Sequence, residues 1–252
     1  MANQAMVIDC HAQAGQGETW NEPKRLVDYR VESMLERAAE VGIDRICIMA
    51  PRNDSYAEAN LVVTRLCEKH SEKLIGFAVH NPQREAGNLK AALTEDVRSR
   101  GLKGLKTDGH PTREILDVVV ELGIPVIYYP PHNERSNLVE MYHLMAATYP
   151  TVNFILPHLG AYRSSPWGDH FAAIALARRH RNIHLEASGL DGYQYLEVAA
   201  KDLPAEQLVF GSFAPEHDAR IEMYAFKLPK LPPDQQAKTL GGNMQRLLRL
   251  GA

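Results

Sequence analysis

Six of the eleven histidines in this 252-residue sequence stand at or shortly after the end of a short apolar run. They are His11, His80, His110, His132, His158 and His217. Imidazole binds transition metals and transfers protons near neutral pH. If the apolar runs are strands whose ends meet, these side chains gather at one mouth and could hold a metal or a ligand there. The alternative is that polar loops simply tolerate histidine.

Other chemically useful side chains follow the same runs. Lys106 could hold a carboxylate or phosphate group of a substrate, and the phenol of Tyr129 could donate a proton to an oxyanion. Asp108 and Glu186 could orient the histidines. Lys106 could equally form an ion pair with Asp108 or Glu186 that has no catalytic role.

Eight apolar runs alternate with segments whose apolar residues recur at helical spacing. The runs are Met6–Cys10, Arg45–Ala50, Leu74–Val79, Leu102–Lys106, Pro125–Tyr129, Asn153–Pro157, Ile183–Glu186 and Leu208–Gly211. Gly42, Gly101 and Gly123 each follow a predicted helix, where a left-handed residue would end it. Strands separated by helices run parallel. We therefore predict an α/β fold, a (β/α)8 TIM barrel with its active site at the C-terminal ends of the strands.

An open, doubly wound sheet is the alternative, but no GxGxxG motif follows any predicted strand. The loop Pro229 to Pro233 leads into a last predicted helix, Gln235 to Leu250. We find no domain linker and no internal repeat, so residues 1–252 are expected to form one domain.

Composition indicates the class of partner. With 45% hydrophobic residues, 23% charged residues and a net charge of −3, the chain resembles an average globular protein and lacks a basic patch for nucleic acid or an anionic membrane. The expected ligand is therefore a small molecule. Three cysteines without a CxxC pair favour a reducing compartment. No apolar run is long enough to span a bilayer and no leader is evident, so the expected location is the cytoplasm.

Several runs together resemble the amidohydrolase-2 family, which comprises metal-dependent TIM-barrel hydrolases and decarboxylases. They are VIDCHAQAG, GLKGLKTDGH, LGIPVIYYP, NFILPHLG, LVFGSFAP and GGNMQRLLRL, in the family's order and spacing over nearly the whole chain. The resemblance implies a hydrolase for a small carboxylated or cyclic organic substrate, zinc or another divalent metal, and a homodimer. It also implies His11 and His158 as metal ligands.

Three family ligand positions carry other residues. The second histidine of the strand-1 HxH motif is Gln13, the strand-5 histidine falls on Tyr129, and the strand-8 aspartate falls on Phe213. A phenyl ring can neither coordinate a cation nor accept a proton. Catalytic zinc normally has three protein ligands, and the retained positions supply two. The resemblance therefore implies an incomplete metal site.

Three hypotheses remain open. In the first, a metal site is rebuilt when His11 and His158 are joined by loop residues, drawn from Asp108, His110, His132 and His217. In the second, no metal is bound; Lys106 holds the substrate, His11 or His158 is the general base and Tyr129 a proton donor. In the third, the barrel is catalytically silent and binds a ligand or a partner, because Gln13, Tyr129 and Phe213 make its mouth less charged and more aromatic. The predicted substrate contacts are Gln13, Asp108, His110, Glu186, Phe213 and His217.

Overall fold

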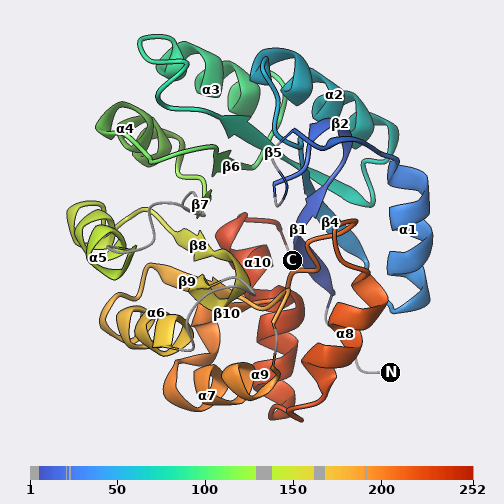
Figure 1. Cartoon of the computed structure of the whole chain (residues 1–252), viewed down its shortest axis with the longest axis vertical. Coiled ribbons are helices and arrows are strands. Elements are labelled where there is room, and N and C mark those ends of the chain that lie inside the picture. Colours follow the sequence, from blue (N-terminus) through green and yellow to red (C-terminus); the bar gives the residue numbers. More distant parts are fainter. Residues whose placement is uncertain are drawn as a thin grey trace.

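Eight parallel strands form the centre of the molecule. The computed structural model describes residues 6–20, 22, 24–128, 138–161, 168–190 and 192–251. The strands lie side by side in chain order (Figure 1). They are β1 (Ile8–Gln13), β4 (Arg45–Met49), β5 (Leu74–His80), β6 (Gly104–Thr107), β7 (Val126–Tyr128), β8 (Phe154–Leu156), β9 (Ile183–Glu186) and β10 (Leu208–Val209). The predicted TIM barrel is confirmed.

A short seam joins the last strand to the first. Ala12 and Ala214 form a parallel bridge between the two segments. The Asp9 carboxylate on β1 accepts hydrogen bonds from Ser212, through its hydroxyl at 2.5 Å and its backbone N–H at 2.8 Å. It also accepts one from the backbone N–H of His11 at 3.0 Å. One buried carboxylate therefore ties the first strand to the segment that follows the last.

Helices surround the barrel as an outer ring (Figure 1). They are α1 (Val31–Glu40), α2 (Tyr56–Lys69), α3 (Leu89–Arg98), α4 (Arg113–Leu122), α5 (Leu138–Thr148), α6 (Gly168–Arg179), α7 (Gln194–Asp202) and α8 (Ala219–Lys227). Gly42, Gly101 and Gly123 have φ angles of 76°, 76° and 64° beyond helix ends, as predicted. Glycine has no Cβ to clash in this left-handed conformation, so it ends a helix at little cost.

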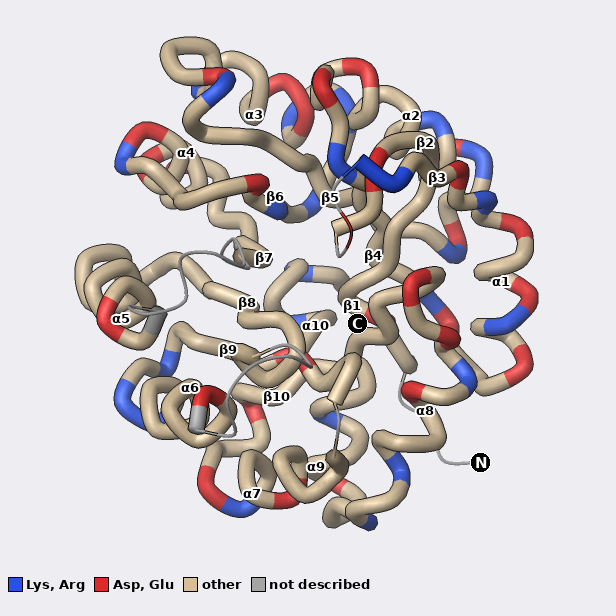
Figure 2. The backbone as a smooth tube through the Cα atoms, in the orientation of Figure 1, with Lys and Arg blue, Asp and Glu red and all other residues tan. Residues whose placement is uncertain are grey.

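Lys and Arg residues and Asp and Glu residues are both dispersed along these outer helices (Figure 2). The strands instead carry the apolar residues of one hydrophobic core. No helix within the described ranges is both long and apolar enough to cross a membrane.

A hairpin of β2 (Gly15–Glu18) and β3 (Leu26–Tyr29) was not predicted. Its strands are short and rich in glycine and polar residues, so they lack the apolar alternation that marks a strand. Glu18 and Arg52 exchange two backbone hydrogen bonds, of 2.7 and 2.9 Å. These bonds fasten the hairpin to the loop after β4.

The predicted last helix is one helical stretch with a wider turn inside it. It comprises α9 (Pro233–Ala237), a π-helical turn (Lys238–Gly242) and α10 (Asn243–Leu247). It therefore begins before Gln235 and ends before Leu250. A Cβ on Gly241 would lie 1.8 Å from the carbonyl oxygen of Met6, so this turn presses directly on the chain that leads into β1.

Candidate active site

Lys106 and His11 meet in the middle of the barrel mouth. Lys106 lies on β6 and is 2% exposed, and its Nζ donates a hydrogen bond of 2.9 Å to Nε2 of His11 on β1. The ammonium group also lies 4.1 Å from the centre of the Trp20 ring. Burial, and then the charge of Arg52, lower the pKa of Lys106 to about 7. Among the described residues Lys106 forms no ion pair with Asp108 or Glu186, so the predicted structural pairing is wrong.

Glu186 joins this pair to His158. Its Oε2 atom accepts hydrogen bonds from the backbone N–H of His158 at 3.1 Å and from the Ser188 hydroxyl at 3.0 Å. Nδ1 of His11 lies 3.5 Å from the same oxygen. Burial raises the pKa of Glu186 to about 8, so the carboxyl group is largely protonated at neutral pH. Oε2 accepts these contacts, whereas Oε1 is buried and has no hydrogen-bond partner within the described chain.

His158 is held by an unusual backbone. It lies in a 3-10 turn (Pro157–Gly160) with a left-handed φ of 57°. Nδ1 of His158 lies 3.1 Å from the backbone oxygen of Ser188 and 3.0 Å from its hydroxyl oxygen. Burial lowers the pKa of His158 to about 3, and burial followed by the charge of Lys106 lowers that of His11 well below its usual value. Both rings are therefore neutral at pH 7.

Phe213 stands among three histidines. Its ring centre is 4.9 Å from those of His11 and His158 and 5.6 Å from that of His217. Nδ1 of His217 lies 2.9 Å from a carboxylate oxygen of Glu222 on α8. Glu222 also accepts a 2.9 Å hydrogen bond from the backbone N–H of Gly189. Sequence analysis missed Glu222, because an isolated helical glutamate carries no motif.

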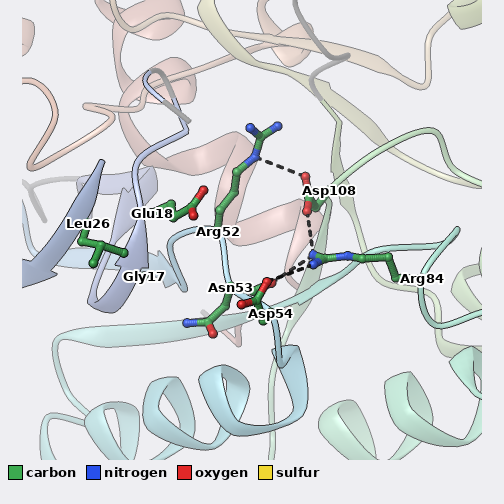
Figure 3. A pocket seen from close by; sticks show the side chains of 8 residues that line it. All are labelled: Gly17, Glu18, Leu26, Arg52, Asn53, Asp54, Arg84 and Asp108. Carbon is green, nitrogen blue, oxygen red and sulfur yellow. Dashed lines mark hydrogen bonds and ion pairs between the residues drawn. The ribbon is translucent and has the colours of Figure 1, made fainter. Parts of the chain in front are cut away.

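Asp108 belongs to a different group of side chains. It accepts hydrogen bonds from Tyr56 Oη at 2.8 Å and from Arg84 at 3.1 Å, and it pairs with Nε of Arg52 at 3.3 Å. It therefore does not orient a histidine, contrary to the prediction. With these two arginines Asp108 borders a pocket of about 260 Å³ (Figure 3). The pocket is lined by Gly17, Glu18, Leu26, Arg52, Asn53, Asp54, Arg84 and Asp108.

Arg52 and Trp20 connect this pocket to Lys106. The guanidinium carbon of Arg52 lies 5.2 Å from the centre of the Trp20 ring, which also faces Lys106. Nε1 of Trp20 is buried without a hydrogen-bond partner in the described part of the chain. Sequence analysis assigned neither residue a role, although Arg52 stands just after a predicted strand, where the site residues of a barrel are expected.

The remaining predicted residues are placed apart from this cluster or outside the description. His110 forms a short hydrogen bond with the Tyr128 hydroxyl and packs edge-on against its ring. His80 turns away from the mouth, with its ring nitrogens 3.1 Å from Glu85 and 3.0 Å from Asp96. Gln13 is fully buried at the end of β1, and its amide has no hydrogen-bond partner among the described residues. Tyr129 and His132 lie outside the described residues.

The whole barrel matches a known family. The amidohydrolase family model matches residues 8–250. The chain belongs to the amidohydrolase family. The predicted resemblance is thus confirmed. No curated protein matches the amidohydrolase described here.

Several solved structures share the fold of this amidohydrolase. The 5-carboxyvanillate decarboxylase from Sphingomonas paucimobilis has 13% identity and a TM-score of 0.74, with 98% of this chain and 100% of that chain covered. A dihydroxybenzoic acid decarboxylase from Polaromonas, with bound manganese and 2-nitroresorcinol, has 15% identity and a TM-score of 0.74 over 97% of each chain. A probable 2-pyrone-4,6-dicarboxylic acid hydrolase from Acinetobacter baumannii has 16% identity and a TM-score of 0.72, covering 97% and 99%.

The described residues do not fit the family's divalent metal. No group of three or more histidine, cysteine, aspartate or glutamate side chains in the described ranges is arranged to hold one. Nε2 of His11 instead accepts a hydrogen bond from the ammonium group of Lys106. That ammonium group lies where a metal bound to this nitrogen would lie. Asp108 and His110, two candidates for a rebuilt site, have other partners. Within the described chain, Lys106 is the cationic group that contacts His11.

Proposed function

We propose that this amidohydrolase is a decarboxylase for a small carboxylated aromatic or cyclic compound, and that it uses Lys106 and His11 in place of a metal. The contact that carries this proposal is the 2.9 Å hydrogen bond between Nζ of Lys106 and Nε2 of His11 inside an aromatic, buried cluster. The decarboxylases that share the fold support the reaction class.

Substrate binding would begin with charge. A carboxylate that enters beside Trp20 meets two cations, Arg52 and Lys106, which both face the indole ring. Phe213 and Trp20 remove water from the carboxylate, and a desolvated carboxylate loses CO2 more readily than a hydrated one. A hydroxyl or oxo group next to the carboxylate can accept a hydrogen bond from Lys106.

The bond changes then balance without an added oxidant. A proton first moves from Lys106 to the ring carbon that bears the carboxylate, and the neighbouring oxygen becomes a carbonyl group. The carbon–carboxylate bond then breaks, CO2 leaves, and its electron pair returns to the ring and that oxygen, where Lys106, once it has regained a proton from solvent, stabilises the negative charge. His11 accepts the remaining Lys106 hydrogen bond and keeps Nζ in place. The pKa of about 7 makes Lys106 able both to lose and to regain this proton near neutral pH.

Hydrolysis is the second candidate, because a probable hydrolase shares the fold. Hydrolysis requires a base that activates water. In the family an aspartate does so, and Phe213 occupies that position in this chain. His11 and His158, both neutral, are the described groups that could accept the proton. A silent ligand-binding barrel is the third candidate.

The test is a panel of hydroxylated benzoates, pyrone carboxylates, esters and lactones, with CO2 release and ring deuteration in D2O as readouts. We expect CO2 release that survives chelation and falls at least 100-fold in Lys106→Met. Lys103→Met, which removes an exposed lysine just before the same strand, should retain full activity.

Three outcomes contradict the proposal. Activity that is lost on chelation, restored by manganese and unaffected by Lys106→Met would establish a metal mechanism. Turnover of esters or lactones alone would establish hydrolysis. Ligands that raise the melting temperature without turnover of any compound would favour the silent barrel.

A further inference from the structure

Two histidines meet on the outer ring of helices. His143 lies within α5, and His180 directly follows α6. Nδ1 of His143 is 2.7 Å from Nε2 of His180, and their ring centres are 4.8 Å apart. His143 is exposed and His180 partly so. Neither residue belongs to the mouth cluster, and the family match assigns neither of them a role.

The spacing of these two nitrogens is close to that of a pair of metal ligands. Zinc binds imidazole nitrogen at about 2.0–2.1 Å, so two nitrogens on one metal lie about 2.9 Å apart at a right angle and about 3.3 Å apart at a tetrahedral angle. The observed 2.7 Å separation is a hydrogen bond that small side-chain rotations would open to that range. Both nitrogens already face each other.

Hydrogen bonds to the backbone fix the two segments that carry these rings relative to each other. Nδ2 of Asn182, in the turn after His180, donates hydrogen bonds of 3.2, 3.1 and 3.0 Å to the carbonyl groups of Ala146, Tyr149 and Val152. The turn that carries His180 is therefore fixed to the end of the helix that carries His143. A site held in this way loses little conformational freedom when it binds a ligand.

The charge state of His180 also suits a cation. Burial, and then the neighbouring charges of His143 and Arg179, lower the pKa of His180. A neutral imidazole has a lone pair for a metal, whereas a protonated one does not. Arg179 is a positive charge close to the site, so it weakens cation binding.

We propose that His143 and His180 form a surface site for a late first-row divalent cation, namely Cu(II), Ni(II) or Zn(II), with water completing the coordination. Imidazole nitrogen suits these metals, and Cu(II) binds most tightly in the usual order of affinities. The site is independent of the proposed decarboxylase chemistry.

Calorimetric titration of the full chain with Cu(II), Ni(II) and Zn(II) tests the proposal. The double variant His143→Ala/His180→Ala should lose one equivalent of Cu(II) relative to wild type, whatever the barrel mouth binds. Each single variant should weaken that equivalent at least tenfold. Arg179→Ala should tighten it several-fold, because a repelling charge is removed.

Electron paramagnetic resonance of the Cu(II) complex should show coupling to two nitrogens in wild type and fewer in each single variant. His70→Ala, at the end of α2, is the matched control and should leave the titration unchanged. Circular dichroism melting would show that the variants are folded. Equal Cu(II) stoichiometry and affinity in wild type and in the folded double variant would overturn the proposal.

Discussion

Lys106 contacts His11, which the family resemblance implies as a metal ligand. Its ammonium group donates to Nε2 of His11, while Glu186 lies on the other side of the same imidazole, at 3.5 Å from Nδ1. These contacts favour the neutral tautomer of His11 that carries its proton on Nδ1. Phe213 packs against both His11 and His158.

Trp20 provides a direct reporter of this cluster. The chain has two tryptophans, so Trp167→Phe leaves Trp20 as the sole indole. Because Lys106 lies over the Trp20 ring, we expect Trp20 emission in this variant to change as pH rises through about 7, where Lys106 loses its charge. Adding Lys106→Met should abolish the transition. A transition that persists in the double variant would assign it to another group.

At the scale of elements, a buried ionic group ties β5 to α3. His80 is 1% exposed and lies between Asp96 on α3 and Glu85. Asp96 also accepts a 2.6 Å hydrogen bond from Arg100. Although burial lowers the pKa of His80, the hydrogen bonds with Asp96 and Glu85 outweigh it and raise the pKa to about 9.

This raised pKa predicts a pH-dependent contribution to stability. The folded pKa of about 9 exceeds the ordinary value of 6.5, so the folded state binds the proton more tightly. The stabilisation is complete below pH 6.5, is lost as pH rises through 9, and is on the order of 3 kcal/mol. Urea unfolding of wild type and His80→Gln between pH 6 and 9.5 should show a difference that shrinks with pH. A constant difference would contradict the assignment.

Substitution by alanine is expected to have opposite effects on stability at two glycines, Gly211 and Gly242. A Cβ on Gly211, just after β10, would lie 2.2 Å from Oε1 of Glu186, whereas the nearest atom to a Cβ on Gly242 is 3.6 Å away. Gly211→Ala should therefore displace Glu186 and destabilise the fold by about 1–3 kcal/mol. Gly242→Ala, inside the last helical stretch, should stabilise it by about 0.5–1 kcal/mol. Thermal melting compares the two, and equal shifts would contradict the packing argument.

At the scale of the whole molecule, the barrel depends on the seam between its first strand and the segment after its last. The Asp9 carboxylate is the side chain that accepts hydrogen bonds from both sides of this seam. Next to it, the backbone N–H of Cys10 donates to the carbonyl oxygen of Phe210 at 3.0 Å. Loss of these hydrogen bonds would open the barrel between β1 and the segment after β10, while the hydrogen bonds between the other neighbouring strands would stay in place.

Asp9→Ala should therefore destabilise the whole barrel. It leaves the Ser212 hydroxyl and two backbone N–H groups without their partner, which costs about 3 kcal/mol or more. Ser212→Ala removes one donor and should cost about 1–2 kcal/mol. Urea unfolding measures both, and hydrogen exchange at the Cys10 amide should accelerate in Asp9→Ala. Asp202→Ala, exposed at the end of α7, is the control and should change neither value.

Much of the barrel could be predicted because its signals are local. Apolar runs such as Arg45–Met49 are strands buried on both faces, and Gly42 or Gly123 ends a helix wherever it occurs. The β2–β3 hairpin could not be predicted, since its strands pair with each other and are fastened to Arg52 through backbone hydrogen bonds rather than through an apolar pattern. The π-helical turn was not predicted because it packs, at Gly241, against Met6. These two residues are far apart in the sequence, so their contact leaves no local pattern.

The sequence alone determined the eight-stranded barrel and the family, because periodicity, glycine positions and motifs are properties of short segments. Only the tertiary structure decided that Lys106 faces His11, that Asp108 pairs with arginines, and that His80 turns toward α3. Successive side chains of a strand point to opposite sides of the sheet. The side chains at the end of the strand and in the following loop can point to either side. Which group each side chain meets therefore depends on packing between segments far apart in the chain.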